Sequence, residues 1–154
     1  MSTTHALTLL LERAESERDE ALRALQDAQQ QANAARDQQG QLAQYRSEYQ
    51  QRWTATFARA TTVDILGCYQ NFSGRLNQAI DQQGLISVHA DRRVDMAREV
   101  LRERELRVAS VRKLLERRRL DQLRLASRQE QKASDEQAAR TAYASQHGFM
   151  RLSA

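Results

Sequence analysis

The sequence predicts an all-α protein, a long antiparallel two-helix coiled-coil hairpin with an overhanging C-terminal helix. Three observations lead to this fold class. The 154 residues include no proline, the strongest helix breaker, and they are rich in Ala, Leu, Gln, Glu and Arg, which favour helix. Apolar residues recur at three- and four-residue steps along two long stretches. Aromatic residues make up only 5% of the chain, too few for a closed globular core, so we expect residues 1–154 to form a single coiled-coil domain.

The first helix is expected over about residues 4–56. Its apolar stripe is rich in alanine and therefore narrow, which fits a coiled-coil partner better than a wide core. The stripe consists of Leu7, Leu11, Ala14, Leu22, Leu25, Ala28, Ala32, Ala35 and Leu42.

The second helix is expected over about residues 63–140, followed by a flexible tail over about 141–154. A capping box, with Thr61 as the cap and Asp64 three residues later, marks its start. The steps of four from Ile86 to Ala90 and from Ala90 to Val94 indicate a stutter in the heptad pattern. Its apolar stripe consists of Ile65, Tyr69, Phe72, Leu76, Ala79, Ile86, Ala90, Val94, Ala97, Leu101, Val108, Val111 and Leu115.

The connection between the two helices, at about residues 57–62, is short enough to make them antiparallel. A turn centred near residue 60 places Leu7 opposite about Lys113. The second helix should therefore have no partner within the chain from about Glu116 onward. This unpaired part leaves self-association through Leu115, Leu120 and Leu123 open.

Candidate catalytic chemistry is scarce in this sequence. His5, His89 and His147 are far apart, and Cys68 has no Cys or His at metal-ligand spacing, so we expect it to be a small buried residue. No phosphate-binding loop or nucleophile elbow is present. We expect no enzyme, no catalytic or metal-ligating residue and no cofactor. The lone cysteine and the lack of a membrane span or signal peptide favour a cytoplasmic location.

The charge pattern is mildly basic, with 24 Lys and Arg against 20 Asp and Glu and a net charge of +4. Between Arg92 and Arg124, arginines alternate with carboxylates at helical spacing, which favours a solvated, self-paired surface. Docking onto an acidic protein surface is the alternative. Nucleic-acid binding is not expected, because neighbouring carboxylates would repel phosphates and no aromatic residues interleave. Arg117, Arg118 and Arg119 lack close acidic neighbours and form the best electrostatic docking site.

Six of the eight aromatic residues fall near the expected turn. A two-helix tip cannot bury all six rings, so two interpretations stay open. The rings form a hydrophobic plug that closes the hairpin, or they form a protein-docking patch. These residues are Tyr45, Tyr49, Trp53, Phe57, Tyr69 and Phe72.

Several of these residues resemble the flagellar FliJ family. The segment from Leu42 to Tyr49 contains a Tyr-x-x-x-Tyr motif, and Tyr69-Gln-Asn-Phe72 follows on the second helix, with Leu76, Ala79 and Ile80 and then Val94-Asp95 and Ala97. The resemblance covers about residues 5–140. It implies a non-enzymatic, stalk-like component of the flagellar type III export apparatus. Such a protein would bind and stimulate the hexameric export ATPase, contact the cytoplasmic domain of the export gate and escort export chaperones, while peripherally associated with the inner face of the cell membrane.

The resemblance also implies two binding regions. It maps export-gate binding to Gln38, Leu42, Tyr45, Tyr49, Phe72, Leu76, Ala79 and Gln83, where Gln83 replaces the histidine expected of the family. A core role competes with a surface role for this set, and we favour exposure for Tyr45, Tyr49 and Phe72. Charge and geometry then place the ATPase at the other end, on Arg13, Arg18, Arg117, Arg118 and Arg119. The alternatives are the stalk of a virulence-type injectisome and a generic coiled-coil scaffold or basic adaptor.

Overall fold

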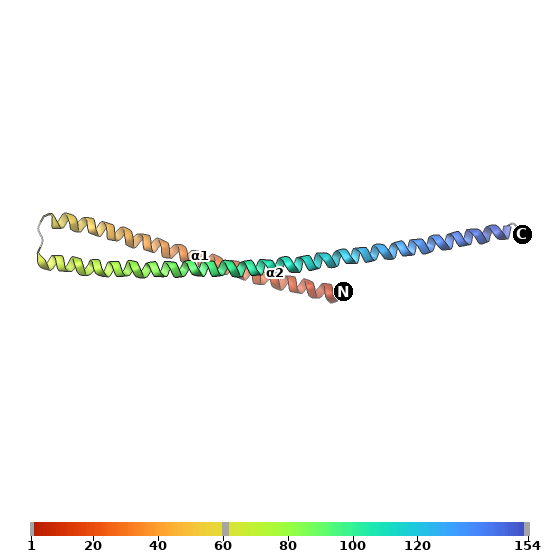
Figure 1. Cartoon of the computed structure of the whole chain (residues 1–154), viewed down its shortest axis with the longest axis horizontal. Coiled ribbons are helices and arrows are strands. Elements are labelled where there is room, and N and C mark those ends of the chain that lie inside the picture. The colour runs from red at the N-terminus through yellow and green to blue at the C-terminus, as the bar shows by residue number, and fades with distance from the viewer. Residues whose placement is uncertain (1, 60–61, 153–154) are drawn as a thin grey trace. The chain divides into compact units, whose positions relative to one another are not determined.

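Two long helices account for almost all of the described chain. The computed structural model describes residues 2–59 and 62–152, in which α1 spans Ser2–Phe57 and α2 spans Val63–Leu152 (Figure 1). The two helices pack against each other as a helical hairpin, which confirms the all-α class. Within the described ranges, neither helix has a stretch long and apolar enough to cross a membrane.

The second helix is longer than the sequence analysis predicts. Residues 141–152, expected in a flexible tail, continue α2 to Leu152, while residues 153–154 lie outside the described ranges. The segment contains two alanines and no proline. Its one glycine, Gly148, costs a helix only about 1 kcal/mol relative to alanine. The prediction overestimated the effect of that glycine.

Hydrogen bonds from Thr62 define the start of α2. The Ile65 backbone N–H donates to Thr62 Oγ1 at 3.3 Å, and the Leu66 N–H donates to the Thr62 carbonyl at 3.1 Å. These are the bonds of a helix N-cap, so Thr62 caps α2. Thr61, the predicted cap, lies outside the described residues. At the other side of the turn, the Arg59 N–H donates to the Thr56 carbonyl at 3.1 Å.

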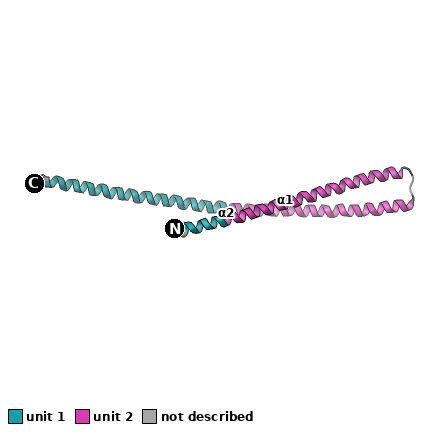
Figure 2. Ribbon diagram, turned by 180° about the vertical axis from the view of Figure 1, so that it is seen from behind, with its two compact units in different colours: residues 1–13, 107–154 teal, residues 14–106 magenta. Residues whose placement is uncertain are grey.

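The chain divides into two compact units, where the sequence analysis expected a single domain. Unit 1 comprises residues 1–13 and 107–154, and unit 2 comprises residues 14–106 (Figure 2). Unit 2 contains the turn, and the facing residues of its two helices form a seam with strictly alternating steps of three and four. On α1 the seam residues are Ala14, Arg18, Ala21, Leu25, Ala28, Ala32, Ala35, Gln39, Leu42, Arg46, Tyr49 and Trp53, and on α2 they are Tyr69, Ser73, Leu76, Ile80, Gln83, Ser87, Ala90, Val94, Ala97, Leu101 and Arg104.

The predicted stutter is absent from the seam of unit 2. Ile86 is 54% exposed, whereas Ser87 is only 6% exposed and occupies the seam between Gln83 and Ala90. The same error affected α1, where Leu22 is 42% exposed and Ala21 is 7% exposed. In both helices the sequence analysis assigned the larger apolar side chain to the seam. The alternating steps of three and four instead place its smaller or more polar neighbour there.

Contacts across unit 2 confirm the predicted antiparallel pairing. Arg36 forms an ion pair with Asp91 at 2.7 Å, and Arg46 Nη1 donates to Asn77 Oδ1 at 3.4 Å. A turn centred at residue 60 predicts residue 74 opposite Arg46 and residue 84 opposite Arg36, so the first pair agrees to within one helical turn and the second, between long side chains, to within about two. The length of the connection therefore sets approximately which residues of α1 lie opposite which residues of α2.

Unit 1 pairs the start of α1 with a later part of α2. Val108 and Val111 are buried, and Gln122 Nε2 donates to Thr4 Oγ1 at 3.3 Å. From residue 116 to residue 151, every residue of α2 is exposed, but the Gln122–Thr4 hydrogen bond means that the unpaired part begins after Gln122 and not at about Glu116 as predicted. We call residues 123–152 the C-terminal extension. At 1.5 Å per residue this extension is about 45 Å long.

Candidate docking surfaces

The six aromatic residues near the turn form one connected cluster in unit 2. Tyr49 lies at its centre, with ring centroids 4.4 Å from Phe72 and 5.8 Å from both Tyr69 and Trp53. Phe57 continues the cluster toward the turn, 5.3 Å from Tyr69. Rings at these separations attract each other beyond the area that they bury. The cluster therefore joins the two helices at the closed end of the hairpin.

Exposure within this cluster varies from ring to ring. Tyr45 is 46% exposed and Phe72 is 37% exposed, and these two rings meet edge to face at 6.3 Å. Tyr49, Trp53 and Tyr69 are half-buried. The plug and the docking patch are thus not exclusive alternatives, because the inner rings close the hairpin while the outer two present apolar surface to solvent.

The residues predicted to bind the export gate separate into two groups. Leu42, Tyr49, Leu76 and Gln83 belong to the seam. Leu76 is 7% exposed and Gln83 is 6% exposed. Gln83 Nε2 donates to the backbone carbonyl of Ala35 at 3.1 Å, so its side chain is part of the hairpin interior. The side chains of Leu76 and Gln83 are therefore not accessible to a partner protein.

The other four members of the set lie beside the seam. Tyr45 and Phe72 are in contact, and Gln38 and Ala79 lie one heptad from Tyr45 and from Phe72, respectively. Residues one heptad apart share a face of a coiled-coil helix, so the four residues follow one side of the hairpin. Gln38, Tyr45 and Phe72 are exposed and Ala79 is half-buried.

The basic residues predicted to bind the ATPase divide between the two units. In unit 1, Arg13 and the run Arg117–Arg119 are exposed. Arg119 Nη2 lies 3.1 Å from Glu116 Oε1, so the prediction that the whole run lacks a close carboxylate is wrong for Arg119. Arg18 belongs to unit 2, occupies its seam and is paired with Asp19 at 3.2 Å.

The alternating charges on α2 pair along the helix surface as the spacing predicts. Arg98 lies 3.8 Å from Asp95, and Arg102 lies 3.9 Å from Glu99. All four side chains are more than 60% exposed, and exposed pairs of this kind contribute little to stability. They lower the local net charge and so keep most of this stretch from attracting an anion.

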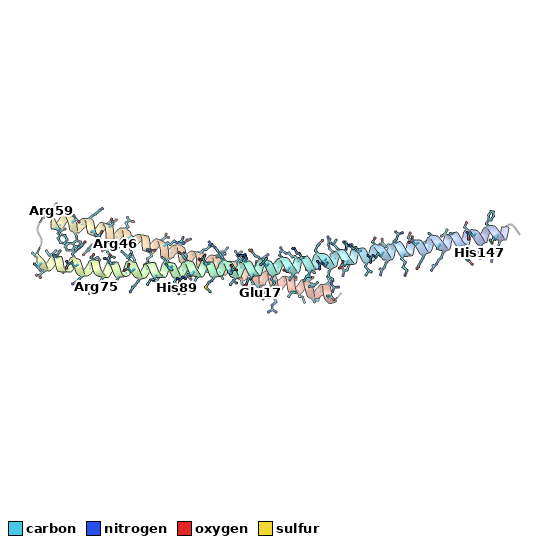
Figure 3. All side chains as sticks on the ribbon, in the orientation of Figure 1. Glu17, Arg46, Arg59, Arg75, His89 and His147 are labelled. Carbon is cyan, nitrogen blue, oxygen red and sulfur yellow. The ribbon has the colours of Figure 1, made fainter. Side chains whose placement is uncertain are left out.

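The described part of the chain contains no cluster of three or more His, Cys, Asp or Glu side chains that could hold a metal ion. Figure 3 labels His89, which belongs to unit 2, and His147, which belongs to unit 1. Cys68 is exposed, contrary to the prediction that it is buried, because it lies one residue before the seam position of Tyr69. The features of interest are therefore surfaces and seam residues.

Two comparisons with known proteins give matches along most of the chain. The family model described as "Flagellar FliJ protein" matches residues 3–147. A flagellar FliJ protein from Salmonella typhi is 30% identical over 142 residues, covering 92% of this chain and 97% of that relative. The match includes both helices and both compact units.

Proposed function

This chain belongs to the flagellar FliJ protein family, and we propose that it is a non-catalytic component of the flagellar protein export apparatus. In this proposal it binds and stimulates the hexameric export ATPase, contacts the cytoplasmic domain of the export gate and escorts export chaperones. It would work in the cytoplasm, at the inner face of the membrane. The family model and the relative from Salmonella typhi both carry flagellar names, which favours this role over the stalk of an injectisome.

The observation that carries the proposal is the family match along both helices, 3–147. Two structural features support it. The aromatic cluster of unit 2 leaves two rings exposed beside the turn, which suits contact with another protein. In unit 1, α2 continues past its pairing with α1 as a fully exposed helix, which suits insertion into a partner.

The proposed mechanism involves no reacting group on this chain. A ring of six ATPase subunits passes through states that differ at their interfaces. A single helical element bound to the ring would contact those states unequally. A ligand shifts an equilibrium by as much as its affinity differs between the states, so unequal contact can raise turnover.

The first test is the rate of ATP hydrolysis by the cognate export ATPase, titrated with this protein at near-physiological salt. We expect a rise that saturates near one chain per hexamer. A flat titration, with an ATPase shown to form hexamers, would remove the stalk role.

Reversing the charges of Arg117, Arg118 and Arg119 to Glu together tests the electrostatic part of the proposal. We expect the triple variant to need at least about tenfold more protein for half-maximal stimulation, because three favourable charge contacts become repulsive. The matched control reverses Arg124, Arg128 and Arg140, which are also exposed on α2. Equal behaviour of the two triple variants would show that the run has no special role.

The gate surface is tested by substitutions at Tyr45 and at Leu76. We expect Tyr45→Ala to weaken binding to the gate cytoplasmic domain about tenfold or more, because the residue is 46% exposed, and to lower the free energy of unfolding by only about 1 kcal/mol through loss of its ring contacts with Tyr49 and Phe72. Leu76→Ala should instead lower the free energy of unfolding by about 2 kcal/mol, because it removes buried side-chain atoms. Binding is measured by titration calorimetry and unfolding by circular dichroism in urea. Unchanged gate binding by Tyr45→Ala would contradict the assignment of this surface.

A further inference from the structure

A second apolar surface lies on α2 of unit 2, outside the two regions considered so far. Its apolar members are Leu85, Ile86, Val88 and Met96, which are 72%, 54%, 50% and 70% exposed. Two arginines, Arg92 and Arg93, interrupt them on the same stretch of helix. We call these six residues the outer patch.

The position of the outer patch in the heptad is unusual. Gln83, Ser87, Ala90 and Val94 form the seam with α1, so Leu85, Val88 and Met96 fall at positions directed away from α1. In a two-helix coiled coil such positions are normally polar, since they face water. Here the seam contains the polar residues Gln83 and Ser87, whereas these outward positions contain leucine, valine and methionine. Packing within the hairpin does not account for these apolar side chains.

The charges beside the patch are not balanced within the chain. Asp91 is paired with Arg36 at 2.7 Å, and Asp95 lies 3.8 Å from Arg98. The carboxylates adjacent in sequence are therefore engaged with other arginines. Among the described residues, Arg92 and Arg93 have no ion-pair partner. The patch thus combines exposed apolar area with two available guanidinium groups.

The surface is also indented at this point. A shallow hollow of about 340 Å³ is lined by Leu85, Ile86, Val88, His89 and Arg92. Apolar side chains and Arg92 line the same hollow, so a partner side chain placed there would meet both. Figure 3 labels His89, which is exposed and marks this part of α2.

We propose that the outer patch binds an amphipathic helix of a partner protein, one that carries acidic residues beside its apolar stripe. The apolar stripe would cover Leu85, Ile86 and Met96, and the carboxylates would pair with Arg92 and Arg93. A second copy of this chain is a poorer occupant, because an isologous contact brings Arg92 and Arg93 of the two copies together. This inference does not depend on the proposed binding of the ATPase or the gate.

The test uses the full chain and a designed probe. The probe is a dye-labelled peptide of about 20 residues, long enough to form a helix on binding. It has leucine at helical i, i+3, i+4 and i+7 spacing and glutamate beside the stripe. A second peptide has lysine in place of glutamate. Binding is followed by fluorescence anisotropy at near-physiological salt, and helix content is checked by circular dichroism.

We expect saturable binding of the glutamate peptide and at least about tenfold weaker binding of the lysine peptide. Leu85→Ser with Met96→Ser should weaken binding of the glutamate peptide about tenfold or more. Arg92→Glu with Arg93→Glu should reverse the preference between the two peptides. The matched control is Leu123→Ser with Leu125→Ser, two leucines on the same helix that are each 57% exposed, and it should leave binding unchanged.

Four outcomes would overturn the proposal. The first is equal binding of the two peptides, and the second is equal loss of binding in the Leu123 and Leu125 control. The third is dimerisation in sedimentation velocity that the patch variants abolish, which would make the patch a self-association surface. The fourth is loss of gate binding in the patch variants to the extent seen for Tyr45→Ala, which would make the patch part of the gate surface.

Discussion

Two polar residues in the middle of the hairpin seam show how single side chains set its local stability. Gln83 satisfies its buried amide by donating to the Ala35 carbonyl. Ser87, four residues later, is equally buried, and its Oγ has no hydrogen-bond partner in the described structure. A buried hydroxyl without a partner loses its hydration and gains nothing in return. The seam therefore contains one satisfied and one unsatisfied polar group, four residues apart.

Ser87→Ala should raise the free energy of unfolding, because it removes the unpaired hydroxyl and keeps a small side chain. We expect a gain of about 1 kcal/mol in urea unfolding followed by circular dichroism. Ser47→Ala is the control for helix propensity, since Ser47 is exposed on α1. An equal gain at both sites would show that burial of the Ser87 hydroxyl has no energetic effect.

Among the helical elements, the continuous heptad seam governs which apolar residues are buried. Val94 is 7% exposed at a seam position, whereas Ile86, eight residues earlier, is 54% exposed although its side chain is larger. Position in the repeat, and not hydrophobicity, decides burial here. The same rule leaves apolar side chains such as Leu85 and Met96 exposed on α2 and buries the polar side chains of Gln83 and Ser87.

Val94→Ala and Ile86→Ala test this rule as a pair. We expect Val94→Ala to lower the free energy of unfolding by about 1–2 kcal/mol, because it leaves a gap in the seam. Ile86→Ala should change it by no more than about 0.5 kcal/mol, as is usual for exposed sites. Both are measured by urea unfolding. If Ile86→Ala lowers the free energy of unfolding more than Val94→Ala does, Ile86 lies in the seam and the rule is wrong.

The helices and their pairing could be predicted from the sequence, because the absence of proline and a short connection leave few alternatives. The aromatic cluster was predictable for the same reason, since antiparallel pairing brings Tyr49 to Phe72. Whether an individual residue lies in the seam or on the outer surface could not be predicted as well. Ile86 and Ser87 are neighbours, and only the register of the whole seam, fixed by packing against α1, distinguishes them. The binding roles of the candidate residues remain predictions, because they depend on partners.

For the whole molecule, the two compact units differ in how much of each helix is covered. In unit 2 both helices contribute to one seam from Ala14 to Arg104. In unit 1 only the first part of the α2 segment faces α1, and the C-terminal extension is exposed at every described position up to residue 151. An isolated helix is only marginally stable in water, because it lacks tertiary packing.

Amide hydrogen exchange on the full chain should reveal this difference. We expect the C-terminal extension to exchange far faster than the seam segments of unit 2, by about tenfold for every 1.4 kcal/mol of difference in opening free energy. The measurement is exchange followed by mass spectrometry of peptides from both units. Equal protection would indicate that another molecule, such as a second copy, covers the extension.

The alanines and the aromatic rings of unit 2 also have a consequence for the width of the hairpin. Alanine layers such as Ala32 and Ala35 allow two helices to approach closely, whereas layers of Tyr49, Trp53 and Tyr69 hold them apart. A regular heptad repeat offers a partner protein equivalent positions along its whole length. The repeat alone therefore does not fix where along the hairpin the partner binds. Aromatic and alanine layers hold the two helices at different distances. A partner's binding site that fits the aromatic end would therefore fit loosely around the alanine layers.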